Sequence, residues 1–195
     1  PPRSTLFPYT TLFRSFGAMA LFEESADVVT YMDESVNGIG VGTPVKRSGV
    51  QVGKVKRIEL AWQKYPFDAK LLETPGPEAE AARKAYGLVV VTMALSDGAL
   101  IGAPAGRMSP RDLTGALERQ GLRVRITQPG ITGAPFLSLV ADGDAAAVDA
   151  GAVPWKERHD RQIYIASARS QGAQMLASAD ARSEEHTSEL QSPNT

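Results

Sequence analysis

Most of the fold assignment depends on one glycine-rich stretch near the N-terminus, which reads Asn37-Gly38-Ile39-Gly40-Val41-Gly42-Thr43-Pro44-Val45-Lys46-Arg47-Ser48-Gly49-Val50-Gln51-Val52-Gly53-Lys54-Val55-Lys56-Arg57-Ile58. The three glycines before Thr43-Pro44 are typical of a turn that needs positive φ angles. The following residues predict two strands on either side of Ser48-Gly49. Their alternation slips near Gly53-Lys54, which indicates a β-bulge. The stretch therefore predicts a tight loop followed by a β-hairpin.

Working outward, the chain alternates between short apolar strands and turns. Further strands are predicted at residues 28–32, 88–95, 122–126 and 136–140, with a short extended piece at 163–165. A helix is predicted from Ser109 to Gly121, because Ser109 is a good N-cap and Pro110 suits the first helical position. Its Leu113 and Leu117 share one face, and an Ala-rich segment at 78–86 predicts a second helix. The pattern favours a mainly β fold with one or two short helices.

The composition excludes several classes of protein. The 195 residues carry a net charge of −1, whereas nucleic-acid-binding domains are usually strongly basic, so we expect no nucleic-acid partner. The chain contains no cysteine, which excludes disulfide scaffolds, thiolate metal sites and cysteine nucleophiles. It also contains no run of apolar residues as long as a membrane-spanning helix requires.

No catalytic, metal or cofactor site is predicted. The segment 49–54 resembles a phosphate-binding loop, but its glycines are one residue too close and Val55 stands where Ser or Thr must bind magnesium. His159 lies between Arg158 and Asp160 and is most simply a solvated surface residue. The carboxylates at 142, 144 and 149 lack the spacing of a calcium loop. We therefore expect a protein that is not an enzyme.

Five basic residues gather on the predicted hairpin: Lys46, Arg47, Lys54, Lys56 and Arg57. One interpretation is that they form its ordinary solvent-facing side. The other is that they contact anionic lipid head groups or an acidic partner. The sequence leaves both open.

The two ends of the chain differ in character from the rest. Residues 5–15 and 182–192 resemble in-frame translations of two common sequencing-library adapters. On this interpretation 1–15 and 182–195 are tails that are not native, and 16–181 is the natural part. The alternative is a pair of natural polar tails. In either case these segments lack a periodic apolar face, so we expect them not to pack on the domain.

Two separated motifs resemble those of the MCE ("mammalian cell entry") family. The first is the segment 33–58, which contains the glycine-rich stretch quoted above and in which Ile39 replaces the usual leucine. The second joins 121–124, 130–133 and 136–139, in which Thr132 replaces an apolar residue. Both motifs occur in the order found in the family, so the resemblance covers about residues 27–141.

The resemblance implies a small seven-stranded MCE-type β-barrel over 27–141, with an insertion at 61–86. Residues 16–26 would lead in from a missing N-terminal membrane anchor, and 142–181 would be a linker and the truncated start of a C-terminal helical region. It also implies a periplasmic homohexameric ring anchored to the inner membrane, which transports phospholipid together with an ABC-transporter permease and ATPase. A ring that only tethers or scaffolds membranes is the alternative function.

The resemblance also places a pore-lining loop in the chain: Pro129, Gly130, Ile131, Thr132 and Gly133. Six copies of Ile131 around the ring axis would supply an apolar path for acyl chains. The alternative is that Ile131 only caps the core beneath a hairpin.

Overall fold

The computed structural model describes residues 25–66, 75–96, 108–130, 132–142 and 162–170, together with 98, 100, 153, 155, 172 and 173. The predictions for both tails, for the lead-in up to residue 24 and for most of 142–181 lie outside these residues. No helix among the described residues is both long and apolar enough to cross a membrane.

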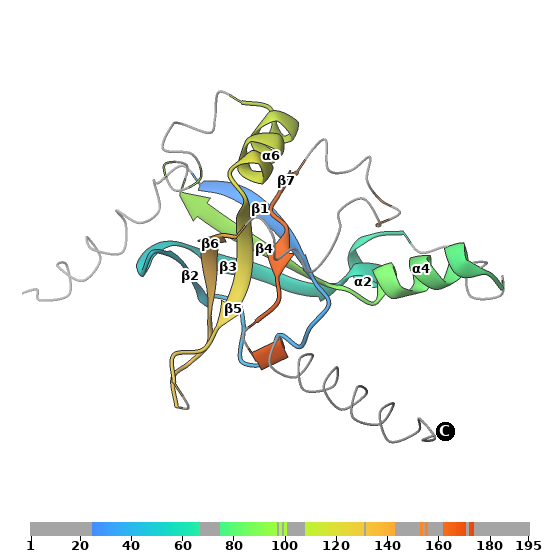
Figure 1. Ribbon diagram of the computed structural model, residues 1–195, viewed down its shortest axis with the longest axis horizontal. Coiled ribbons are helices and arrows are strands. Elements are labelled where there is room, and N and C mark those ends of the chain that lie inside the picture. Colours follow the sequence, from blue (N-terminus) through green and yellow to red (C-terminus); the bar gives the residue numbers. More distant parts are fainter. Residues whose placement is uncertain are drawn as a thin grey trace, which may run out of the picture.

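The described chain is mainly β, as predicted (Figure 1). The strands are β1 (Ser25–Met32), β2 (Pro44–Arg47), β3 (Val50–Leu60), β4 (Val89–Ser96), β5 (Leu122–Thr127), β6 (Phe136–Ala141), β7 (Ile163–Tyr164) and β8 (Ser167–Ala168). The helices are α2 (Ala61–Lys64), α4 (Pro77–Tyr86) and α6 (Pro110–Arg119). The strands form one sheet in the order β7-β1-β4-β3-β2-β6-β5-β8.

One short segment forms both edges of this sheet. β7 pairs with β1 and β8 pairs with β5, although only two residues separate β7 from β8. Between them, Ile165 N–H donates to the Val29 carbonyl at 3.0 Å, and the Ala166 carbonyl accepts from Val124 N–H at 2.9 Å. The segment 163–168 therefore bridges the two edges. If β7 and β8 are counted as one strand, the eight strands become the seven that were expected.

The extended piece at 163–165 was predicted, but its place was wrong. It was expected in the linker region after residue 142, whereas the structure makes it part of the sheet. The reason is physical: strands of two residues show no hydrophobic alternation, and their pairing with β1 and β5 joins residues that are distant in sequence.

The hairpin of β2 and β3 has the predicted turn and two bulges. Ser48 and Gly49 turn with φ angles of 50° and 83°. The β2–β3 register shifts after Val45, which pairs with Gly53 while Lys46 pairs with Gln51, so one extra residue sits in β3. A second shift lies between Val55 and Arg57, opposite β4. The first bulge lies next to Gly53-Lys54, where the slipped alternation predicted it.

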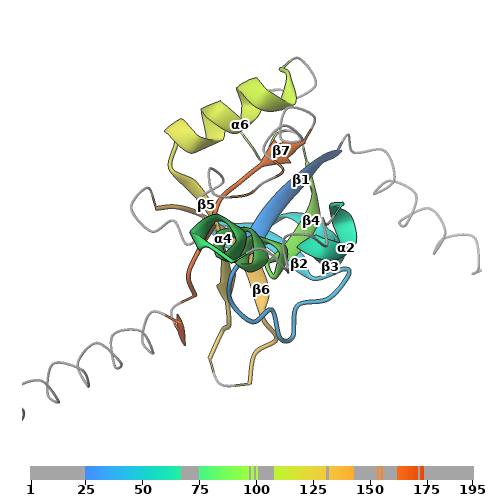
Figure 2. The ribbon, with the colours of Figure 1, turned by 90° about the vertical axis from the view of Figure 1, so that its right-hand side faces the viewer.

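The principal core lies on one face of the sheet and is covered by α6 (Figures 1 and 2). Leu113 and Leu117 of α6 are each 1% exposed and pack in this core with strand residues such as Val91 and Met93. The predicted cap is present, because Ser109 Oγ accepts from Asp112 N–H at 3.2 Å. The helix also contacts the segment 163–168, called the closing segment below, since Thr114 Oγ1 accepts from Tyr164 N–H at 3.0 Å.

A second core lies where the inserted segment meets β1 and β4, and it is rich in aromatic rings. Trp155 stacks on Tyr65 with ring centroids 4.5 Å apart, and Tyr86 and Tyr31 lie 5.0 Å and 5.8 Å from it. The hydroxyls of Tyr31 and Tyr65 are 2.8 Å apart. Burial, reinforced by this hydrogen bond, raises the pKa of Tyr31 above its ordinary value, so the phenol stays protonated. Within the 61–86 insertion, Ala61, Tyr65 and the C-terminal end of α4 therefore belong to this core, whereas most of the rest of α4 is exposed.

Candidate functional site

The candidate pore loop is the connection between β5 and β6. The two strands pair antiparallel as far as Thr127 and Phe136, and the chain between them projects beyond the end of the sheet (Figures 1 and 2). Pro129, Gly130 and Thr132 are exposed, and Gly133 is half-buried. The structure therefore places four of the five predicted residues on a projecting loop.

Two glycines give this loop its shape. Gly130 has a φ of +66°, a conformation that side-chain-bearing residues rarely adopt. A Cβ on Gly133 would lie 2.1 Å from the Pro129 carbonyl oxygen and 2.5 Å from its Cγ. The backbone at 133 therefore turns back against Pro129, which only glycine permits without a shift of the loop.

Ile131, the residue on which the pore interpretation depends, lies outside the described residues. Its described neighbours Gly130 and Thr132 are exposed. Neither belongs to the principal or the aromatic core.

The base of the loop is attached to the glycine-rich segment of the first motif. Gly38 has a φ of +81°, and a Cβ there would approach Pro135 Cγ to 2.6 Å. The two sequence motifs therefore meet in space at this point, although residues 38 and 135 are far apart in the chain.

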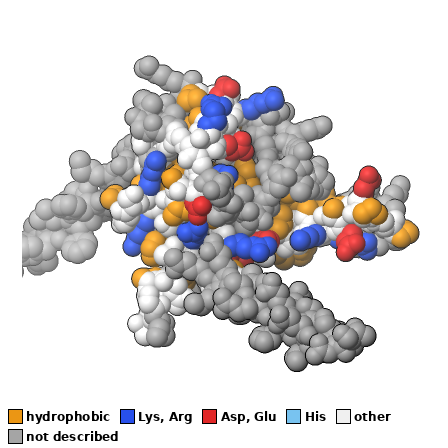
Figure 3. Space-filling model, viewed as in Figure 1, with side chains coloured by type: hydrophobic (Ala, Val, Ile, Leu, Met, Phe, Trp, Pro, Cys, Tyr) orange, Lys and Arg blue, Asp and Glu red, His pale blue; other side chains and the backbone are white. Residues whose placement is uncertain are grey.

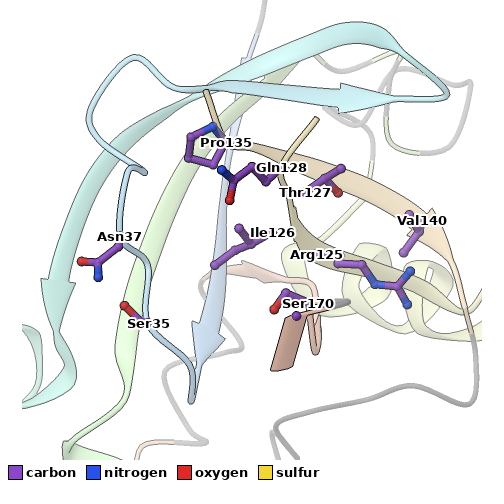
Figure 4. A pocket seen from close by; sticks show the side chains of 10 residues that line it. Ser35, Asn37, Arg125, Ile126, Thr127, Gln128, Pro135, Val140 and Ser170 are labelled. Atoms are coloured by element: carbon purple, nitrogen blue, oxygen red, sulfur yellow. The ribbon is translucent and has the colours of Figure 1, made fainter. Parts of the chain in front are cut away.

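Beside this contact lies a cleft of 660 Å³ (Figure 4). Its walls come from the first motif, from β5 and β6 and from the chain after β8, with lining residues Ser35, Asn37, Arg125, Ile126, Thr127, Gln128, Pro135, Val140, Ser170 and Gly172. Arg125 is engaged by Asp142 in an ion pair. The sequence does not predict this cleft, because its walls are brought together only by tertiary contacts.

The chain after β8 is held against the first motif by polar contacts. Glu34 accepts from Ser170 N–H at 3.0 Å and from Ser170 Oγ at 2.6 Å, and Arg169 forms an ion pair with Asp33 at 3.5 Å. Ser170 Oγ in turn accepts from Ala173 N–H at 3.2 Å. The closing segment is thus anchored at both ends, by Thr114 of α6 and by residues 33–34.

The five basic residues of the hairpin do not act as one cluster. Lys46 lies over the Phe136 ring, with Nζ 4.5 Å from the centroid. Arg47 donates to the Leu100 carbonyl at 3.1 Å. Both are half-buried and therefore make contacts within the domain. On the face shown in Figure 3, Lys and Arg side chains are spread out, with Asp and Glu side chains between them.

Lys54, Lys56 and Arg57 are exposed. Lys56 pairs with Asp27 at 2.8 Å, whereas Lys54 and Arg57 have no ion-pair partner in the described part of the chain. Lys56 and Arg57 also line a groove of 410 Å³, which Lys54 does not. Lys46 and Arg47 therefore make contacts within the domain, whereas Lys54, Lys56 and Arg57 are exposed. Of these three, Lys56 and Arg57 line the same groove.

The described residues assemble no group of three or more His, Cys, Asp or Glu side chains that could hold a metal ion. His159 lies outside the described residues, as do Asp144 and Asp149.

The family model for the MlaD protein matches residues 25–142, more than half of the chain. The chain belongs to the MlaD family. This is the MCE family whose motifs the sequence resembles, and the match covers β1 to β6 with the projecting loop.

A search of curated proteins found no match. Among solved structures, the MlaD-family chain is similar to a chain of the Acinetobacter MlaFEDB complex in its ATP-bound Vtrans1 conformation, with 13% identity and a TM-score of 0.34. That similarity covers 83% of this chain and 86% of the other. At this level of similarity it carries no argument about function.

Proposed function

We propose that this MlaD-family chain is a ring subunit that conducts phospholipid between the membranes of the bacterial envelope. In this proposal six copies assemble in the periplasm, anchored to the inner membrane, and work with an ABC-transporter permease and ATPase. Family membership supports a component of a lipid-transport system. The observation that carries the finer proposal is the projecting, exposed, glycine-shaped loop between β5 and β6.

A protein of this kind needs no covalent chemistry. A phospholipid with two long acyl chains has on the order of 30 methylenes, and exposing them to water costs on the order of 20 kcal/mol at about 0.8 kcal/mol each. That barrier prevents rapid transfer of free lipid through an aqueous compartment. A continuous apolar path removes most of it.

A ring of projecting loops can supply that path. Around a sixfold axis the loops would converge and present six copies of Ile131 to the centre. The loop shape set by Gly130 and Gly133 permits close approach, because neither residue adds a side chain to the throat.

Substitution of Ile131 tests the proposal directly. Ile131→Asp would place six carboxylates in a narrow throat, where each is costly to desolvate and all repel one another. We expect photo-crosslinking of labelled phospholipid to the assembled ring to fail, while thermal melting stays near that of the parent. Ile131→Leu keeps the apolar lining and should behave like the parent. Thr132→Leu, which restores the apolar residue usual in the family, should retain lipid equally well or better.

Two results would contradict the proposal. Unfolding by Ile131→Asp would mean that Ile131 caps the core. A folded Ile131→Asp ring that still crosslinks lipid as the parent does would favour the ring that tethers or scaffolds membranes without conducting lipid.

A further inference from the structure

A charged groove whose described lining contains no residue of the loop 129–133 is not used by the proposed transport path. It has a volume of 410 Å³ and lies where β3 and β4 meet the one-turn helix α2 of the insertion. Lys56 and Arg57 both line it although they are neighbours in sequence. In a regular strand they would point to opposite faces, but the bulge between Val55 and Arg57 brings both to one side.

Among the described residues that line the groove, the positive charges outnumber the negative charges by one. The groove contains the cations Lys56, Arg57 and Lys64 and the carboxylates Asp27 and Glu59. Lys56 Nζ lies 2.8 Å from both oxygens of Asp27, so this pair is satisfied. Lys64 lies 3.8 Å from Glu59. Arg57 has neither an ion pair nor a hydrogen bond to any described residue, and its guanidinium offers five donors in a fork that suits phosphate oxygens.

Arg57 and Lys64 come together at one point of the sheet. Arg57 is paired in register with Thr92 of β4, and Thr92 Oγ1 accepts from Lys64 Nζ at 3.3 Å. Lys64 is only 16% exposed. Burial lowers the pKa of Lys64, Glu59 opposes this shift, and the positive charge of Arg57 adds to the lowering. The fold thus holds two like charges near each other in a partly dry site, an arrangement that a bound anion would relieve.

Two amide side chains complete the groove. Gln63 Oε1 accepts from Leu60 N–H at 2.9 Å, and Gln63 Nε2 donates no hydrogen bond to the part of the chain that the structure describes. Gln162, from the segment that precedes β7, has a buried Oε1 that accepts no hydrogen bond within the described chain. A ligand that satisfied both would offer phosphate oxygens to the cations and a hydrogen-bond donor to Gln162.

We propose that this groove binds a phosphate ester that also carries a hydroxyl or ammonium donor. Arg57 and Lys64 bind the phosphate, Gln63 donates to it, and Gln162 accepts from the donor group. Both a free glycerol-type phosphate and a phospholipid head group have this chemistry. The proposal is independent of the pore, because none of these residues lies on the loop 129–133.

The first experiment uses sn-glycerol 3-phosphate as the probe with the full chain, measured by isothermal titration calorimetry. Arg57→Gln removes a charge-assisted contact and should weaken binding by roughly ten- to a hundredfold. The matched control is Lys54→Gln, which removes the same charge from the same strand but outside the groove and should weaken binding less than about twofold. Equal losses in the two variants would overturn the proposal, because they would show non-specific attraction.

The second experiment tests the donor half of the site. Methyl phosphate lacks the hydroxyls of glycerol 3-phosphate and should bind about three- to tenfold more weakly to the parent chain. Gln162→Met should abolish this preference without weakening methyl phosphate. A parent chain without the preference would overturn the role of Gln162.

Vesicles distinguish the two sources of the ligand. Phosphatidylcholine vesicles with and without phosphatidylglycerol are sedimented with the parent, Arg57→Gln and Lys54→Gln chains. Binding of the soluble probe identifies a free phosphate ester as sufficient. Binding only to phosphatidylglycerol vesicles, lost in Arg57→Gln but kept in Lys54→Gln, identifies the lipid head group. If neither probe binds in an Arg57-dependent manner, the proposal is wrong.

Discussion

At the scale of single residues, Gly133 determines how the loop between β5 and β6 turns. A Cβ at this position would lie 2.1 Å from the Pro129 carbonyl oxygen. This steric clash can be relieved only if the backbone moves. We therefore expect Gly133→Ala to displace the loop and to lower lipid crosslinking in the assembled ring. The melting temperature should change little, because the described residues of the loop belong to neither core.

The matched control is Gly40→Ala, since a Cβ there has no atom within 4 Å. It should leave lipid crosslinking unchanged. Normal crosslinking by the Gly133→Ala ring would show that the turn at 133 is not needed for the proposed lipid path.

Lys64 predicts a pH dependence of stability with a definite sign. Burial lowers the pKa of Lys64 in the folded chain, so folding disfavours its charged form. This penalty is fully present below the folded-state pKa and is lost as the pH rises to the unfolded value of about 10.4. We expect Lys64→Met to raise the free energy of unfolding relative to the parent near pH 7. This gain in stability should disappear by about pH 11.

Urea unfolding of both chains at the two pH values measures this difference. Lys54→Met is the control, because Lys54 is exposed in the folded chain and its substitution should have the same small effect at both pH values. An advantage of Lys64→Met that grows toward alkaline pH would contradict the assignment.

At the scale of elements, the segments with a local signal were predicted and those defined by distant partners were not. The Ser109 cap, the Ser48-Gly49 turn and the slipped alternation of β3 are all visible in a few neighbouring residues, and the structure has them. The groove lined by Arg57 and Lys64 was not predicted. The helix α2 has only four residues, and its Lys64 contacts Thr92 of β4, which is distant in sequence. The five basic residues are close in sequence. Their positions in the chain therefore could not show that Lys46 and Arg47 make contacts within the domain while Lys56 and Arg57 line the groove.

The helix α6 gives a quantitative test of the principal core. Leu117 is 1% exposed and packs against the strands, so Leu117→Ala removes buried side chain and leaves a cavity. We expect the free energy of unfolding to fall by about 2–5 kcal/mol. Glu118→Ala, on the exposed side of the same helix, should change it by less than about 0.5 kcal/mol. A loss for Leu117→Ala as small as that of the control would make α6 peripheral.

At the scale of the whole molecule, the segment 163–168 completes the sheet. Its side chains are buried throughout, with exposures from 1% to 9%. It supplies the missing neighbour to β1 on one side and to β5 on the other. Without it, both strands would present unpaired N–H and C=O groups and the core beneath them would open to water.

Truncation after residue 160 should therefore unfold the domain or cause it to associate through its exposed edges. Truncation after residue 181 is the matched control, because it keeps the closing segment together with the contacts of Ser170 to Glu34. Calorimetric melting and size-exclusion chromatography measure both effects. We expect the longer chain to melt like the parent and the shorter one to lose its cooperative transition. The local signals in the sequence alone indicate a complete barrel up to residue 141. If that were so, the two truncated chains would melt at the same temperature, and the fold would not require 163–168.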